Sequence, residues 1–267
     1  MGKYLAFFRL RFSMGLQYRA AAVAGIVTQF FWGAMELLAF RAFYDADPAA
    51  FPMAFQATAS YVWMQQAFLA LFGAWFFENE IFQSIRDGSV AYELCRPTDL
   101  YAMWFARSAA NRVSRAVLRC VPILLVAAFL PAPYGMTLPA SPAALLWWLV
   151  TMALAVTVTV GYNMLVYFIT FFTVSPNGVR IVAVSLVELL QGAIIPLPFF
   201  PDGLRQVLEL LPFAAMQNVP LRAWSGDLAG GALYAAAGLQ VFWALVLVGG
   251  GWLLSQKAVK KTVVQGG

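Results

Sequence analysis

The chain has 267 residues and a net charge of +5, with 62% hydrophobic and 11% charged residues. An ordinary soluble domain has about 45–50% hydrophobic and about 25% charged residues. A soluble fold of this size cannot bury so much apolar surface. The absence of histidine excludes Ser-His and Cys-His catalysis and any histidine metal site. No GxxxxGK[ST] motif occurs, so we expect no P-loop ATP binding. Composition therefore predicts an integral membrane protein, with Cys95 and Cys120 as free thiols.

The N-terminal residues 1–20 have apolar side chains at helical spacing, with basic residues between them. The apolar positions are Leu5, Phe8, Phe12 and Leu16. This pattern predicts an interfacial helix that lies on the membrane before the first span. The alternative is a cytoplasmic extension of that span.

Six apolar stretches then follow, and a spanning helix needs about 20 mostly apolar residues. The expected spans are Ala21–Tyr44, Thr58–Phe77, a third that ends at Leu130, Ala144–Val174, Val179–Ile195 and Gly231–Leu254. The sequence thus predicts an all-α integral membrane protein with six transmembrane helices, as one membrane domain over residues 1–267. We find no signal peptide and no separate soluble domain in this pattern.

Two proline-rich segments break the apolar pattern. Residues 131–143 contain four prolines, which predicts an irregular external loop. Prolines also stop the fifth span, and residues 202–212, between Pro201 and Pro212, have the character of a short helix. We expect the segment 196–212 to be an external or re-entrant element before the last span.

Lysine and arginine are distributed unevenly over the predicted loops. With the N-terminus inside, fourteen basic residues fall on the inner side: Lys3, Arg9, Arg11, Arg19, Arg86, Arg96, Arg107, Arg112, Arg115, Arg119, Arg180, Lys257, Lys260 and Lys261. The outer side has Arg41, Arg205 and Arg222. Basic residues concentrate in cytoplasmic loops, so both termini are predicted to be cytoplasmic. The net positive charge then reflects topology, and we expect no nucleic-acid partner.

The polar segment 78–101 lies on the predicted cytoplasmic side and is too long for a tight turn. A short helix along the membrane surface would present Arg86, Asp87, Glu93 and Arg96 to another protein. Charged rims suit oriented and reversible docking. The alternative is a solvated loop.

Two motifs resemble those of the ABC-2 type permease family. Gly88, Ser89, Leu94 and Pro97 are similar to its RxGTxExLLxxP signature, although Ala91 stands where the family often has glutamate. A second match to the family's G-x-x-x-P, L-P and distal arginine is carried by Gly192, Pro196, Pro201, Pro212 and Arg222. The opening KYLAFFRLRFSMGLQYR and the closing VVQGG resemble a branch whose permeases have no ATPase of their own.

This resemblance implies the permease subunit of an ATP-binding cassette exporter in the bacterial cytoplasmic (inner) membrane. The implied partners are a separate ATP-binding subunit and a second permease chain, either another copy or a similar paralogue. ATP and Mg²⁺ would bind to the partner, with no cofactor on this chain. The residues implied to couple to the ATPase subunit are Arg86, Asp87, Gly88, Glu93, Arg96 and Pro97.

Two carboxylates fall inside predicted spans, Glu36 in the first and Glu188 near the middle of the fifth. A bare charge at mid-bilayer costs at least ~2.5 kcal/mol, so each must be protonated, paired or facing water. Candidate residues for the substrate route or the permease–permease interface are Glu36, Glu188, Gln191, Gly192 and Pro196. An internal structural pair, for instance Glu188 with Arg119, is the alternative.

Arg112, Arg115 and Arg119 share one helix face at the cytoplasmic end of the third span. We expect them to reach lipid phosphates or to contact the partner. Two other functions remain open: a secondary transporter driven by protons through Glu36 and Glu188, and an intramembrane enzyme. The second is disfavoured because no catalytic residues or metal-binding cluster can be identified.

Overall fold

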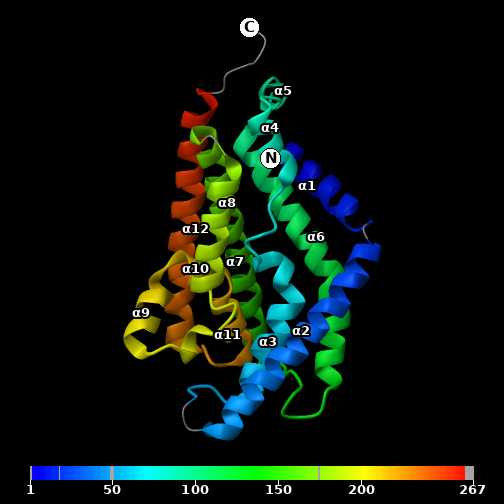
Figure 1. Cartoon of the computed structure of the whole chain (residues 1–267), viewed down its shortest axis with the longest axis vertical. Coiled ribbons are helices and arrows are strands. Elements are labelled where there is room, and N and C mark those ends of the chain that lie inside the picture. The colour runs from blue at the N-terminus through cyan, green and yellow to red at the C-terminus, as the bar shows by residue number, and fades with distance from the viewer. Residues whose placement is uncertain (1, 18, 49–50, 174, 262–267) are drawn as a thin grey trace.

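The computed structural model describes residues 2–17, 19–48, 51–173 and 175–261. Within these ranges its regular secondary structure is entirely helical, with twelve α-helices and no strand (Figure 1). Three helical segments are long and apolar enough to cross a membrane: Ala22–Ala46, Pro142–Phe172 and Gly230–Val259. The all-α prediction is therefore confirmed, and these segments correspond to the first, fourth and sixth predicted spans.

The other three predicted spans are also helices, but shorter or more polar. They are α3 (Phe55–Phe72), α6 (Leu100–Phe129) and α8 (Pro176–Leu190). At 18 and 15 residues, α3 and α8 are shorter than the spans expected there. The 30-residue α6 carries Arg107, Arg112, Arg115 and Arg119 in its first two thirds. Length and hydropathy thus support three of the six predicted spans.

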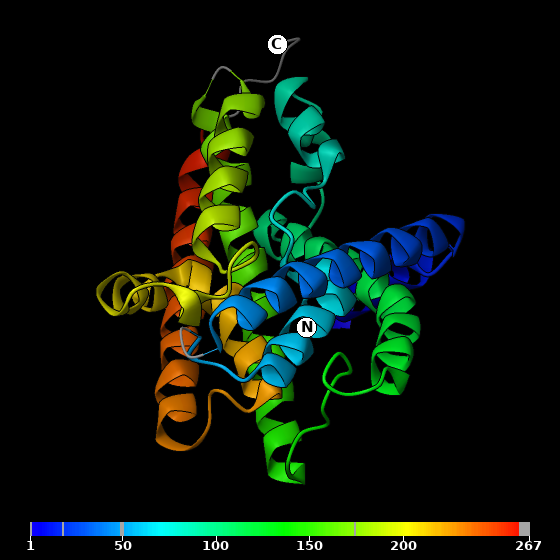
Figure 2. The same cartoon turned by 60° about the horizontal axis from the view of Figure 1, so that its bottom comes forward.

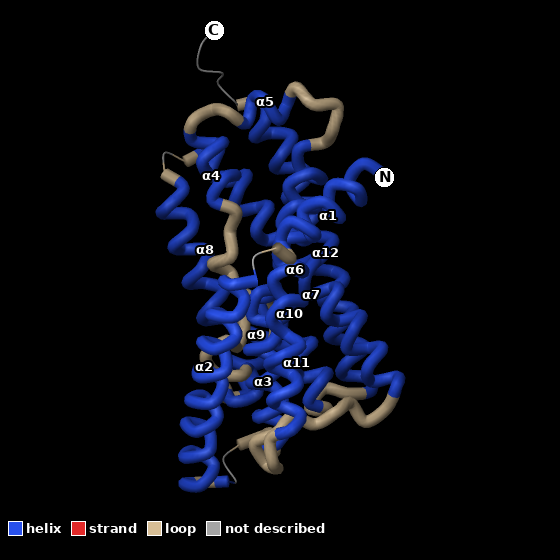
Figure 3. Tube along the Cα trace, turned by 90° about the vertical axis from the view of Figure 1, so that its right-hand side faces the viewer, coloured by secondary structure: helices blue, strands red, loops and turns tan. Residues whose placement is uncertain are grey.

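The central helix α7 (Pro142–Ile169) runs along α12 (Gly230–Val259) and also contacts α3, α6 and α11 (Asn218–Ser225). The helix α2 (Arg19–Ala46) packs against α3 and α6, as Figure 2 also shows. Loops gather at the two ends of the bundle, and shorter loop segments also run between the helices in its middle (Figure 3). Large apolar side chains on α2, α8 and α12 remain exposed, as expected for helices that face lipid or another membrane chain.

The two ends of the molecule differ in the segments they hold. The upper part of Figure 1 contains α1 (Gly2–Gly15), α4 (Asn79–Arg86), α5 (Val90–Leu94) and the C-terminal end of α12. The loops that follow α2 and α6 lie at the lower end. Segments predicted to be cytoplasmic therefore lie together, opposite the proline-rich loop.

The second predicted span ends earlier than expected, at Phe72 instead of Phe77. The guanidinium of Arg112 donates to carbonyl oxygens around this helix end: Leu71 at 2.9 Å, Gly73 at 3.0 Å, Phe76 at 3.3 Å and Ala70 at 3.5 Å. A helix that ends inside a membrane protein needs such donors, because no water satisfies its last carbonyls. Arg112 is only 2% exposed, so the expectation that it reaches lipid phosphates or a partner is wrong.

The fifth predicted span also ends earlier, at Leu190 instead of Ile195. The chain turns at Gly192, whose φ of +81° lies in the left-handed region that favours glycine. Tyr61 Oη and Gln217 Nε2 donate to its carbonyl, at 3.1 and 3.5 Å. The neighbouring Ala193 carbonyl accepts from Gln65 Nε2 at 2.8 Å. Side chains of α3 thus hold the break after α8.

The predicted short helix before the last span is present as α9 (Asp202–Leu210), and α10 (Pro212–Met216) and α11 follow it. Residues 131–141 are irregular as expected, and the Ser141 hydroxyl accepts from the Ala144 N–H at 3.1 Å where α7 begins. The helix expected over residues 1–20 is α1, which packs along α6. Residues 1, 18 and 174 and the VVQGG ending lie outside the described residues.

Candidate functional site

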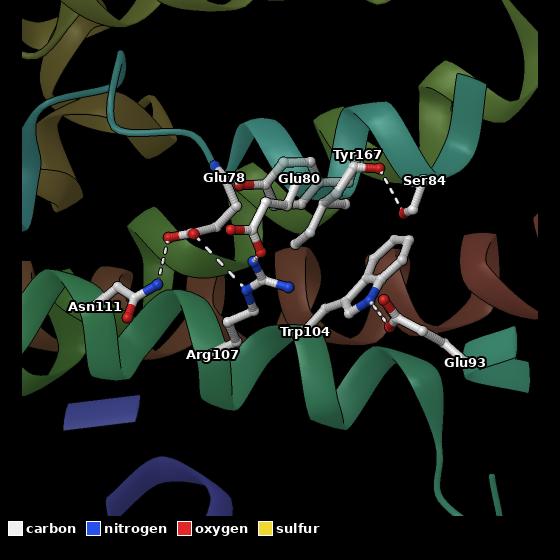
Figure 4. A network of polar contacts seen from close by, with 9 residues as sticks. Glu78, Glu80, Ser84, Glu93, Trp104, Arg107, Asn111 and Tyr167 are labelled. Carbon is white, nitrogen blue, oxygen red and sulfur yellow. Dashed lines mark hydrogen bonds and ion pairs between the residues drawn. The ribbon is translucent and has the colours of Figure 1, made fainter. Parts of the chain in front are cut away.

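The segment 78–101 is held to α6 by a network of charged side chains (Figure 4). Arg107 of α6 is 6% exposed and forms an ion pair with Glu80. Its Nε lies 3.7 Å from Oε2 of Glu78, whose Oε1 accepts from Asn111 Nδ2 at 2.8 Å. The Glu78 backbone N–H donates to the Tyr167 hydroxyl of α7 at 2.7 Å. The start of α4 is therefore fixed to both α6 and α7.

The other end of the segment is fixed to α6 and to α1. The Glu93 carboxylate accepts from the indole N–H of Trp104 at 2.7 Å. Lys3 donates to the carbonyl of Pro97 at 2.8 Å, and the Tyr4 hydroxyl accepts from the Asp99 N–H at 3.0 Å. Glu93, predicted to face a partner, is thus half-buried and turned toward α6. A movement imposed on this segment would act directly on α6.

The outward face of the segment carries four of the six predicted coupling residues: Arg86, Asp87, Arg96 and Pro97 are exposed. Gly88 has a φ of +76° and makes the turn between α4 and α5. In that turn the Ser89 N–H donates to Asp87 Oδ1 at 2.9 Å, and hydrogen bonding from Ser89 lowers the pKa of the Asp87 carboxyl.

Tyr92 completes this face, with 78% of its surface exposed. Sequence reasoning did not select it, although an aromatic residue inside a polar segment is a recognisable signal for a contact surface.

A cavity of about 810 Å³ lies between α2, α3 and α8, with walls that are mostly apolar. It brings together Glu36 and Glu188, which the sequence places in different spans, and Arg119 also lines it. The other candidates do not line it: Gln191, Gly192 and Pro196 are buried beside the break after α8. From that region, Ala193 and Ile194 reach the cavity. The volume falls within the range of about 300–1,000 Å³ typical of small-molecule sites.

Several polar atoms in this cavity have no hydrogen-bond partner among the described residues. Gln66 Nε2 donates to Glu36 Oε2 at 3.3 Å, while Glu36 Oε1 is unpartnered. The side-chain oxygens of Gln29 and Gln65 are unpartnered too. These oxygens can therefore accept hydrogen bonds from a molecule that enters the cavity. None of the three glutamines was a candidate site residue in the sequence analysis. A polar residue within an apolar span is the sequence feature that could have identified them.

Glu188 and Arg119 line the same cavity, but no ion pair joins them in the described structure. The internal pair considered from the sequence is therefore not formed here. A carboxylate that falls in a predicted span and has no basic partner is a functional-site candidate.

Arg222, the arginine of the second family motif, forms ion pairs within this chain. Arg222 of α11 pairs with Glu209 of α9 and with Asp227, each at 2.5 Å. The Arg222 side chain is mostly buried. Through its two ion pairs it connects the short α9 helix to the segment before α12.

Comparison with known proteins agrees with this architecture. Residues 17–266 match the family described as ABC-2 family transporter protein. A search among curated proteins finds no match. Because the family match extends from the end of α1 through α12, the chain belongs to the ABC-2 family of transporter membrane proteins.

Proposed function

We propose that this chain is the permease subunit of an ATP-binding cassette exporter in the bacterial cytoplasmic membrane. Family membership over residues 17–266 is the observation that carries the proposal. Two permease chains, identical or paralogous, would pair with two ATP-binding subunits. ATP and Mg²⁺ would be bound by those subunits, and hydrolysis would occur there.

In the bilayer, α2, α3, α6, α7, α8 and α12 would form six spans with both termini in the cytoplasm. The distribution of basic residues supports this orientation. The short α3 and α8 fit such an arrangement, because irregular backbone is tolerated at membrane depth where protein side chains satisfy it. Arg112 does so at the end of α3, and Tyr61, Gln65 and Gln217 do so after α8.

Coupling to the ATPase would occur through the face formed by Arg86, Asp87, Tyr92 and Arg96. This face is exposed, while the rest of the segment is tied to α6. When the ATP-binding subunits close, the force would pass through the Glu93–Trp104 and Glu80–Arg107 contacts. The two-state movement of α6 relative to α3 would then change access to the cavity.

The 810 Å³ cavity would form part of the substrate route. Its apolar walls suit an apolar or amphipathic substrate, while Glu36, Glu188 and Arg119 supply charges that can recognise a polar group.

The test is co-expression of this chain with a candidate ATP-binding subunit from the same genome. We expect the two to copurify and the ATPase rate to depend on the permease. Mass spectrometry of ligands that copurify would identify the substrate class. Failure to copurify, together with an ATPase rate unaffected by the permease, would reject the proposal.

A proton-coupled secondary transporter is the second candidate, favoured by the location of Glu36 and Glu188 in one cavity. Membrane vesicles distinguish the two functions. Transport driven by an imposed pH gradient without ATP would favour this alternative, whereas transport that requires ATP and survives a proton uncoupler would exclude it.

A further inference from the structure

A second cavity, of about 390 Å³, lies beneath α1 and is lined by four arginines. Arg11 comes from α1, and Arg107, Arg115 and Arg119 come from one face of α6, with Asn111 on the turn between the first two. The remaining walls come from α2, the end of α1 and residues 76–80. Two helices that are distant in sequence, α1 and α6, thus bring four guanidinium groups around one space.

The carboxylates of this cavity do not neutralise all four arginines. Its two acidic lining residues, Glu78 and Glu80, are engaged by Arg107 and Asn111. Arg11, Arg115 and Arg119 have no carboxylate partner in the part of the chain that the structure describes. The contacts made by Arg11 and Arg115 are with aromatic rings, Phe7 at 5.3 Å and Phe76 at 5.5 Å.

Gathering like charges in a partly buried space is unfavourable unless an anion joins them. Burial lowers the pKa of Arg11, and the positive charge of Arg107 acts in the same direction, against the carboxylates of Glu80, Glu78 and Glu93. Since arginine stays protonated at neutral pH, the repulsion is relieved by binding an anion.

The arginine cavity adjoins the apolar cavity. Arg119 and Phe76 line both. Arg119 lies close to the backbone of Gly25 on α2, where an added Cβ would be 2.7 Å from its Cζ. A ligand with an anionic group among the arginines would therefore have an apolar cavity beside it for an attached chain.

We propose that the arginine cavity binds a phosphate group supplied by the headgroup of a membrane phospholipid. Guanidinium groups bind phosphate oxygens through paired N–H donors. Leu5, Leu10 and Met14 on α1 are about half-exposed, as expected for a helix immersed in the membrane surface. The cavity beneath this helix lies where lipid phosphates of the cytoplasmic leaflet are available. Binding requires no ATPase partner, so its test is independent of the proposed transport function.

The test measures lipid binding to the purified full-length chain by native mass spectrometry. Three probes separate the sources of binding: phosphatidylglycerol has the phosphate and the chains, glycerol 3-phosphate has the phosphate alone, and diacylglycerol has the chains alone. The variants are Arg11→Gln and the double variant Arg115→Gln/Arg119→Gln. Arg9→Gln is the matched control, because Arg9 is exposed, lies on the same helix and does not line the cavity.

We expect phosphatidylglycerol to bind more tightly than either other probe. Arg11→Gln should weaken binding about tenfold and the double variant more, since each removes charged hydrogen bonds to phosphate. Arg9→Gln should change binding less than about twofold, as expected for an exposed charge. Arg115→Lys/Arg119→Lys should retain part of the affinity.

Equal losses for Arg11→Gln and Arg9→Gln, or equal binding of diacylglycerol, would overturn the site. Competition by glycerol 3-phosphate at equal concentration would overturn the lipid as the source. If a glutamine variant fails to fold, the Arg115→Lys/Arg119→Lys variant is used instead. The proposal is also rejected if this variant has wild-type thermal stability and binds phosphatidylglycerol no more tightly than diacylglycerol.

Discussion

At the scale of single residues, Arg112 shows how a charged side chain can serve a membrane fold from inside. It is 2% exposed and donates to four carbonyl oxygens at the broken end of α3. Its planar fork can reach several acceptors at once, which a lysine ammonium does less well. The basic residue and the short helix therefore depend on each other.

Arg112→Gln should destabilise the purified chain by at least about 1–3 kcal/mol, the cost of leaving one buried carbonyl group unsatisfied. Arg112→Lys should lose less, because the ammonium retains some of the bonds. Thermal unfolding in detergent measures both. Arg115→Gln is the matched control on the same helix, and a loss of stability as large as that of Arg112→Gln would contradict this role for Arg112.

Glu188 can also be tested by substitution. Among the described residues no ion pair joins it to Arg119, so its charge can be removed without breaking a pair. Glu188→Gln should keep the stability of the complex and lower transport, since glutamine preserves size and hydrogen bonding and removes the charge. Glu188→Ala should also weaken assembly, at a cost of about 1–3 kcal/mol for each buried group that Glu188 hydrogen-bonds in the assembled state.

Thermal stability and vesicle transport are measured for both variants of Glu188 and for Arg119→Gln. If Glu188→Gln destabilises and Arg119→Gln restores part of the loss in the double variant, the two residues form an ion pair in the assembled state. Wild-type values throughout would show that Glu188 is a tolerated residue and remove it from the proposed route.

At the scale of elements, the segment containing α4 and α5 combines an exposed face with firm anchors. Arg86, Tyr92 and Arg96 face outward, whereas Glu80 and Glu93 bind residues of α6. An element that must both receive a partner and transmit its movement needs these two properties together.

Charge reversal on the outward face tests the docking role. Arg86→Glu/Arg96→Glu should weaken copurification with the ATP-binding subunit about tenfold, roughly 1.4 kcal/mol, because rim charges of the wrong sign repel the partner. Arg9→Glu, exposed on α1, is the control for net charge. Unchanged copurification and ATPase stimulation would remove this surface as the docking site.

Glu93→Gln tests the anchor separately. It weakens the charge-assisted bond to Trp104 without altering the exposed face. We expect normal copurification with reduced ATPase stimulation. A loss of copurification equal to that of the double reversal would mean that Glu93 itself belongs to the docking surface.

At the scale of the whole molecule, the α1, α4 and α5 end and the proline-rich loop lie at opposite ends (Figure 1). Cys95 is exposed at the first end, so a membrane-impermeant thiol reagent should label it from the cytoplasmic side. In a Cys95→Ser/Cys120→Ser background, Pro139→Cys should be labelled from outside. Labelling of Pro139→Cys from the inside alone would overturn the orientation.

The sequence by itself determined the membrane class, the helical fold, the family and the segments that carry its motifs, because these depend on composition, local periodicity and short-range spacing. It also determined that Glu36 and Glu188 needed an explanation. The sequence predicted the ends of the helices less well. The helices α3 and α8 end five residues earlier than predicted, because side chains distant in sequence donate hydrogen bonds to the carbonyl groups at their ends.

Only the tertiary structure decided which residues share a space. Arg112, Arg115 and Arg119 share one predicted helix face. In the structure, however, Arg112 is buried against α3, whereas Arg115 and Arg119 line a cavity. Glu93 looked available for docking but faces Trp104. These assignments depend on contacts between helices far apart in the chain. Helical periodicity gives the face on which a side chain lies, but packing between helices decides whether that face meets protein, lipid or a cavity.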